Sequence, residues 1–233
     1  MLYTFILVLH IAAGFTALLS GGFSFTAPKG KKFHNTAGKI YTLAMIGVGS
    51  TAIVMCLMKY NPFLFTIGIF STYMTLTGYR SLQYHKAENK PVLIPDWILL
   101  ISALILAAAF TSYLIMQEGL HLQGLQPVLL VFMGILLSML LGDARMLRSF
   151  DKQKKADLLR RHISRMGGAY ISTVTAFLVT NIHTEPVYIA WLLPTAIGTP
   201  FIAYFIRKFT YKRKTNRQTT KARANQNTLN EKS

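Results

Sequence analysis

The stretch WILLISALILAAAFTSYLIMQ, residues 97–117, contains no charged side chain and is almost entirely apolar. A helix of this length crosses the roughly 30 Å hydrocarbon core of a bilayer, because each residue adds about 1.5 Å. The whole chain has the same character, since 52% of its 233 residues are hydrophobic and only 14% are charged. The apolar residues form long runs and not the narrow stripe of a soluble helix, which indicates that lipid surrounds them.

Seven segments have the length and apolarity that a transmembrane helix requires. They are residues 2–25, 40–58, 62–84, 97–117, 127–147, 166–182 and 187–206. We therefore expect an all-α integral membrane domain of seven helices over residues 1–209. No basic region precedes the first segment, so we expect it to be a retained span and not a signal peptide.

Basic residues are concentrated after the first, third and fifth segments and in the C-terminal tail. The net charge of +17 therefore follows the positive-inside rule, and we expect no nucleic-acid partner. The rule predicts an outside N-terminus and a cytoplasmic C-terminus. Residues 210–233 are polar and basic, and we expect a disordered tail that lies against anionic lipid headgroups.

Two similar stretches precede apolar runs, HNTAGKIY (His34–Tyr41) and HISRMGGAY (His162–Tyr170). Each has a histidine, then a glycine four or five residues later, then a tyrosine three residues after that glycine. Both open segments of the same direction, which predicts parallel three-span repeats, residues 1–85 and 127–207, joined by the span 97–117. The simpler alternative is that such residues are common wherever a helix enters a membrane.

The repeat hypothesis makes His34 and His162 symmetry mates that face each other at the cytoplasmic side. His85 closes the third segment at the same level, and Tyr41 and Tyr170 complete the two motifs. These residues are the first candidates for a binding site.

Asp143 is an acidic residue inside the apolar run 127–147, near its cytoplasmic end. Ionisable groups at such a depth usually turn toward the protein and form pairs. Arg80 and Arg145 are the expected partners. A pair of Asp143 with either arginine has two interpretations. It is either part of a functional site or a simple ion pair that ties two helices together.

His10 lies within the first apolar segment and is a separate candidate. The small residues that share its helical face are Gly14, Ala17 and Gly21. Small residues line helix contacts in membranes, so we expect His10 to face the protein. It is either a buried neutral histidine or part of a ligand site or proton relay, with Asn181 and His183 as candidate partners.

Histidine pairs from different spans hold haem in membrane cytochromes, and neutral imidazole is also a common metal ligand. The leading hypothesis is a cytoplasmic-side site for haem, a metal or a quinone-like redox partner, with His34 and His162 as ligands and Asp143 orienting one of them. The alternatives are a small-solute transporter built from parallel repeats and a noncatalytic membrane scaffold. The chain has one cysteine and lacks the common nucleotide, zinc-protease and c-type haem motifs.

Several stretches resemble a family of bacterial multi-pass membrane proteins described as a domain of unknown function. They are HIAAGFTALLSGG (residues 10–22), KGKKFHNTAGKIY (29–41), RHISRMGGAYISTVTAFLV (161–179) and AWLLPT (190–195). The resemblance covers nearly all of the apolar segments and rests on His34, Gly38, Tyr41, His162, Arg165, Met166, Gly167 and Tyr170. It implies a polytopic helical protein of the bacterial inner membrane and implies no particular ligand.

Overall fold

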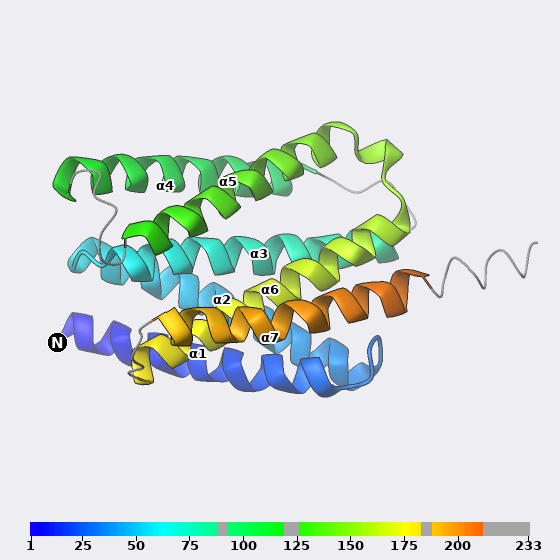
Figure 1. Ribbon diagram of the computed structural model, residues 1–233, viewed down its shortest axis with the longest axis horizontal. Helices are drawn as coiled ribbons and strands as arrows, with labels where there is room; N and C mark the ends of the chain where they lie inside the picture. Colours follow the sequence, from blue (N-terminus) through cyan, green and yellow to red (C-terminus); the bar gives the residue numbers. More distant parts are fainter. Residues whose placement is uncertain (88–92, 119–125, 183–187, 212–233) are drawn as a thin grey trace, which may run out of the picture.

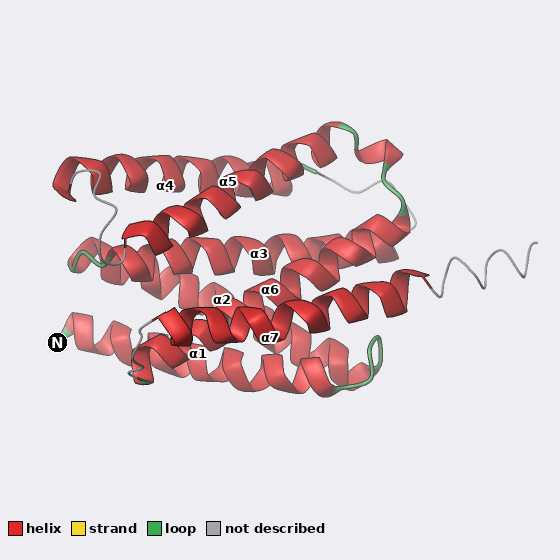
Figure 2. Cartoon of the chain, viewed as in Figure 1, coloured by secondary structure: helices red, strands yellow, loops and turns green. Residues whose placement is uncertain are grey.

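The computed structural model describes residues 1–87, 93–118, 126–182 and 188–211, and the regular structure in this part of the chain is entirely helical (Figure 2). The long helices are α1 (Leu2–Thr26), α2 (Lys32–Met58), α3 (Pro62–Lys86), α4 (Ile94–Glu118), α5 (Gln126–Arg148), α6 (Lys155–Asn181) and α7 (Tyr188–Ile206). Two short helical turns are also present, η1 (Phe150–Lys152) and η2 (Arg207–Tyr211). The expected all-α architecture is confirmed.

Five helices of the described chain are long and apolar enough to cross a membrane, namely α1, α2, α4, α5 and α7. The predicted spans on α3 and α6 do not meet the same test of apolarity. On α3 the reason is its place inside the bundle, where neighbouring helices and not lipid surround its hydroxyl side chains. Thr75 and Thr77, for example, are buried and donate to backbone carbonyls one turn earlier, both at 2.8 Å.

Helix α3 occupies the centre of the bundle (Figure 1). It packs most closely against α6 and also contacts α2, α4 and α5. On one side of this pair α1 packs along α2, and α7 packs along α6. Five helices, α1, α2, α3, α6 and α7, therefore form a more closely packed group, and α4 and α5 lie on its other side.

The start of α3 follows directly from its sequence. The Asn61 side chain caps the helix by accepting from the backbone N–H of Leu64 at 2.9 Å, and Pro62 occupies the first helical position. Proline suits this position because its missing N–H has no partner there in any helix.

Two helices begin earlier than their apolar segments. Helix α2 begins at Lys32 and not near residue 40, and α6 begins at Lys155 and not near residue 166. The apolar runs mark only the lengths that suit lipid, whereas helical hydrogen bonding continues into the polar sequence before them. His34 and His162 therefore lie within helices, and not in loops at the helix ends.

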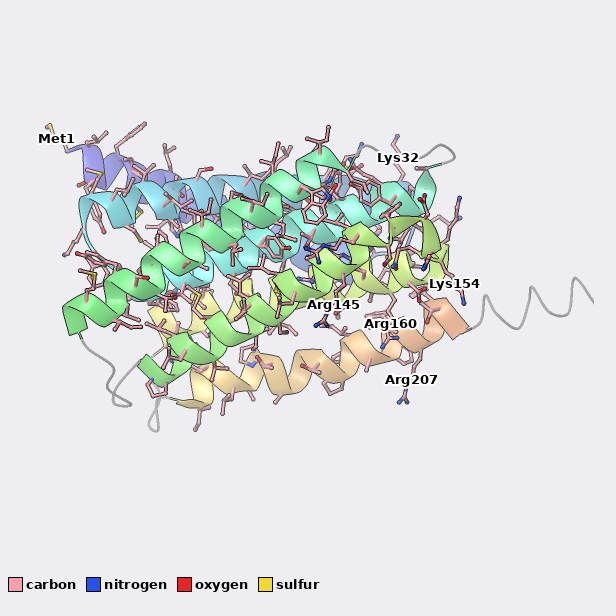
Figure 3. The ribbon with its side chains drawn as sticks, turned by 90° about the horizontal axis from the view of Figure 1, so that it is seen from above. Met1, Lys32, Arg145, Lys154, Arg160 and Arg207 are labelled. Carbon is pink, nitrogen blue, oxygen red and sulfur yellow. The ribbon has the colours of Figure 1, made fainter. Side chains whose placement is uncertain are left out.

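Successive helices run in opposite directions, so alternate connections meet at the same end of the bundle (Figure 1). Figure 3 shows Met1 at one end and Lys32, Lys154 and Arg207 toward the other. We call this second end the basic end. It contains the α1–α2 connection, the last turn of α3, the first turns of α6 and the turn η2.

The two halves of the chain do not pack in the same way. Helix α1 packs along α2, whereas α5, its expected counterpart, packs against α3 and α4. The internal repeat therefore stays a prediction. Most of the expected disordered tail, residues 212–233, lies outside the described residues, while positions 210 and 211 belong to η2.

Candidate functional site

A cavity of about 480 Å³ lies at the basic end, bounded by α1, α2, α3, α6, α7 and η2. Small-molecule sites commonly have volumes of about 300–1,000 Å³, so a ligand of that class fits. The aromatic and basic residues that line it are Phe25, Lys29, His34, Tyr41, His85, Lys86, His162, Tyr170, Phe205, Lys208 and Phe209.

The cavity brings together three histidines that are far apart in the sequence. His34 lies in the first turn of α2, His85 in the last turn of α3, and His162 on α6. The sequence predicted that these three residues lie at one level of the bundle. The structure places all of them around one space.

Two of the histidines are held in the same way. The Nδ1 atom of His34 lies 2.9 Å from the backbone oxygen of Ser24, and that of His162 lies 2.9 Å from the backbone oxygen of Gly78. A carbonyl oxygen only accepts, so Nδ1 carries the proton and Nε2 has the lone pair in each neutral ring. Within the described residues, no protein group is bonded to either Nε2 atom.

The third histidine, His85, has its Nδ1 atom 2.7 Å from the backbone oxygen of Lys155. This hydrogen bond ties the end of α3 to the start of α6. His85 also makes other interactions, so it has less freedom to meet a ligand.

His162 remains neutral at physiological pH. It precedes the apolar part of α6, which begins at Met166. Burial lowers the pKa of His162 to about 4, because the charged ring loses hydration that its hydrogen bond to Gly78 only partly replaces. The neutral ring is the form that offers a lone pair to a ligand.

The two motif tyrosines meet at the inner end of the cavity. The rings of Tyr41 and Tyr170 pack edge to face, with centroids 6.2 Å apart. Both rings lie against Gly21, where an added Cβ atom would come within 2.4 Å of the Tyr170 ring and 3.0 Å of the Tyr41 ring. A glycine is required at this position because the rings occupy the space of a side chain.

The cavity has basic groups but no acidic ones among the described residues that line it. Lys29 Nζ donates to the backbone oxygens of Ser24 and Phe25 and lies 4.8 Å from the centre of the Phe205 ring. Lys86 and Lys208 are exposed at the ends of α3 and η2. The site is thus electropositive and suits a ligand that carries negative charge.

Asp143 is buried, as expected, but its partners differ from the expected ones. Its carboxylate accepts from Tyr73 Oη at 2.6 Å and pairs with Arg161 and Arg165 at 2.5 and 2.7 Å. Both arginines come from α6, so Asp143 ties α5 and α3 to the part of α6 that carries His162. The carboxylate is directed at guanidinium groups and not at a histidine ring, so the expected orienting contact is wrong.

The two arginines expected beside Asp143 lie elsewhere. Arg80 pairs with Asp96 at the start of α4, with its Nη2 atom 2.7 Å from Oδ2, and Tyr84 joins the same group. Arg145 is exposed on α5. Sequence spacing suggested both pairs, but it does not reveal which helix faces which.

His10 faces the neighbouring helix, as predicted. Its Nδ1 atom lies 2.8 Å from Thr51 Oγ1 on α2. Asn181 was expected to be a partner of His10, and this prediction is wrong, because the Asn181 side chain donates to the backbone oxygen of Phe177. The other, His183, lies outside the described residues. His10 is not part of the histidine cavity.

Metal ligation by side chains alone has little support in the described chain, where no three His, Cys, Asp or Glu residues are grouped to hold an ion.

Sequence reasoning missed the cavity residues Lys29, Lys86 and Lys208, because it used basic residues only to assign the membrane orientation. The proximity of Lys29 to the HNTAGKIY motif was the available signal.

These features define a multi-helix membrane protein with a ligand-sized, histidine-lined cavity. The chain belongs to the family "Predicted membrane protein (DUF2306)", whose model matches residues 7–146. The family expected from the sequence is therefore confirmed. The match includes His34, His85 and Asp143 but ends before the second motif, so it is shorter than the resemblance suggested. Comparison with curated proteins and with solved structures gives no match.

Proposed function

We propose that this protein binds haem in the histidine cavity, with His34 and His162 as the two axial ligands. The observation that supports the proposal is that the two imidazole rings have the same hydrogen bonding. Each donates Nδ1–H to a backbone carbonyl and leaves Nε2 without a protein partner in the described chain. Histidines that bind metals in proteins typically have this arrangement, because the backbone bond fixes the ring and its tautomer.

Haem fits the available ligands better than a bare metal ion. A structural zinc site needs four protein ligands and a catalytic one needs three, and no group of three is present in the described residues. The haem macrocycle supplies four nitrogens, so two histidines complete the coordination of its iron. The apolar lining, including Leu159, Ile163 and Met166, provides contacts for the rest of the macrocycle.

The test is an optical spectrum of the full chain, purified in detergent after expression with haem supplied. We expect a Soret band with the spectrum of a six-coordinate, low-spin haem. His34→Ala and His162→Ala should each remove the low-spin signature, because each takes away one axial ligand. His10→Ala is the matched control, since His10 lies on the same bundle, is also hydrogen-bonded, and is outside the cavity.

Two results would contradict the proposal. The first is a folded protein that takes up no haem under these conditions. The second is a haem complex whose spectrum is the same in wild type, His34→Ala and His162→Ala. Circular dichroism of each variant shows whether its helices are retained.

A quinone-like redox partner is the second candidate, because an unprotonated Nε2 atom accepts a hydrogen bond from a quinol O–H group. The mostly apolar cavity beside Tyr41 and Tyr170 suits a ring of that kind. This candidate is favoured over haem if the wild-type protein shows no Soret band but binds a quinol, and if His162→Ala loses that binding. The small-solute transporter and the noncatalytic scaffold stay as further alternatives.

The membrane arrangement is also a proposal in its finer points. All seven long helices cross the bacterial inner membrane, with the N-terminus outside and the basic end in the cytoplasm. The positive-inside rule supports this orientation, since the basic connections gather at one end of the bundle (Figure 3). The histidine cavity then opens near the cytoplasmic face.

A further inference from the structure

The cavity is chemically graded from its inner end to its mouth. Tyr41, Tyr170 and Gly167 lie at the inner end, deep in α2 and α6. His162 lies at the level of Gly78, to which it is bonded. Lys86 is eight residues further along α3, which places it about 12 Å closer to the end of the bundle.

Three lysines surround the mouth from different elements. Lys29 comes from the α1–α2 connection, Lys86 from the last turn of α3 and Lys208 from η2. These elements are separate in sequence and meet only at the basic end of the bundle (Figure 1). No acidic residue in the described lining neutralises them.

The lysines have donors to spare. An ammonium group has three N–H donors, and Lys29 uses two of them on the backbone oxygens of Ser24 and Phe25. Lys208 lies 3.3 Å from the Tyr204 hydroxyl, and Lys86 is exposed. Each lysine can therefore donate at least one charge-assisted hydrogen bond to an anion at the mouth.

We propose that Lys29, Lys86 and Lys208 hold the two propionate carboxylates of haem at the mouth, so that the site selects a dianionic ligand in one orientation. This inference rests on the haem site proposed above. Haem is an apolar disc with both carboxylates on one edge, and the cavity has apolar walls, with His162 further inside than the lysines at its mouth. The charge of the ligand then determines which edge enters first.

The experiment compares haem with haem dimethyl ester, which has the same macrocycle and iron but no carboxylate charge. We expect wild-type protein to bind haem about tenfold more tightly, which corresponds to ~1.4 kcal/mol from two exposed charge pairs. The titration follows the Soret band of the full chain in detergent. Since the comparison changes only the ligand, it does not depend on the folding of a variant.

The protein side of the test uses the double variant Lys86→Ala/Lys208→Ala. It leaves Lys29 in place, because Lys29 also holds the α1–α2 connection through two backbone oxygens. We expect most of the preference for haem over its ester to disappear. The matched control is Lys39→Ala, since Lys39 is exposed on the same helix as His34 and does not line the cavity.

The outcomes separate this inference from the haem site itself. Equal binding of haem and its ester by wild type overturns the lysine assignment while the Soret band leaves the histidine site intact. A preference that is unchanged in the double variant also overturns it. If neither compound gives a Soret band, the histidine site and the lysine assignment both fail.

Discussion

Replacement of Gly21 by alanine should destabilise the protein, because the space for a Cβ atom is already filled. The added atom would lie 2.4 and 2.6 Å from two carbons of the Tyr170 ring and 3.0 Å from the Tyr41 ring. The Tyr170 ring has little freedom to retreat. Its hydroxyl donates to the backbone oxygen of Leu18 at 3.3 Å, and its ring stacks on Phe25 with centroids 6.2 Å apart.

The size of the effect can be isolated with a second glycine on α1. Gly14→Ala is the matched control, since no atom lies within 4 Å of its added Cβ. Both changes gain the same helical propensity, up to about 1 kcal/mol, so that contribution cancels in the comparison. Overpacking a filled site costs about 1–3 kcal/mol, and we expect Gly21→Ala to be less stable than Gly14→Ala by that amount.

The assay is reversible unfolding of the purified variants in mixed detergent micelles, followed by helical circular dichroism. The free energies of unfolding of the two variants are compared under the same conditions. Equal stabilities would refute the packing argument, because the tyrosine pair fills the space of an added Cβ atom at Gly21 and no such group lies beside Gly14. A destabilised Gly14→Ala would refute the assignment of open space beside Gly14.

Three further predictions concern pH, charge and topology. Because burial lowers the pKa of His162 to about 4, its ring should stay neutral as the pH falls through 6.5, and an NMR titration of the haem-free protein should show protonation of His162 only near pH 4. Protonation near pH 6.5 would contradict the burial of the ring. Asp143→Asn should lower the free energy of unfolding by about 3 kcal/mol, because it leaves two guanidinium groups of α6 without their buried carboxylate, and a variant as stable as wild type would contradict this. Reporter fusions after Phe25 and after Phe209 should both report cytoplasm, and a periplasmic signal from either would reverse the orientation.

The candidate site was partly predictable from the sequence. The paired motifs identified His34, His162, Tyr41 and Tyr170, and all four line the same cavity. The motifs could be grouped in advance because a histidine at the start of an apolar run must lie near one end of a bundle. Helix direction and depth follow from the order of the segments, so residues at equal depth can be grouped without coordinates.

The partners of the charged residues were not predictable in this way. Asp143 was expected to pair with Arg80 or Arg145, yet it pairs with two arginines of α6, and Arg80 pairs with Asp96. The order of the segments places these residues along their helices, but it gives neither the rotation of each helix nor the choice of its neighbour. The central position of α3 could have been suspected from its buried hydroxyl residues, which lipid does not tolerate without partners.

The sequence by itself determined the membrane class, the all-helical architecture and the concentration of positive charge in alternate connections. Each of these depends on local composition, because the apolar length of a helix and the cost of moving charge into lipid are set by nearby residues. The tertiary structure alone decided that α3 packs along α6, that Tyr41 and Tyr170 meet over Gly21, and that three lysines share one cavity mouth. A helix that is apolar on every side gives no sign of which face meets its neighbour, so these contacts are settled only when the helices pack together.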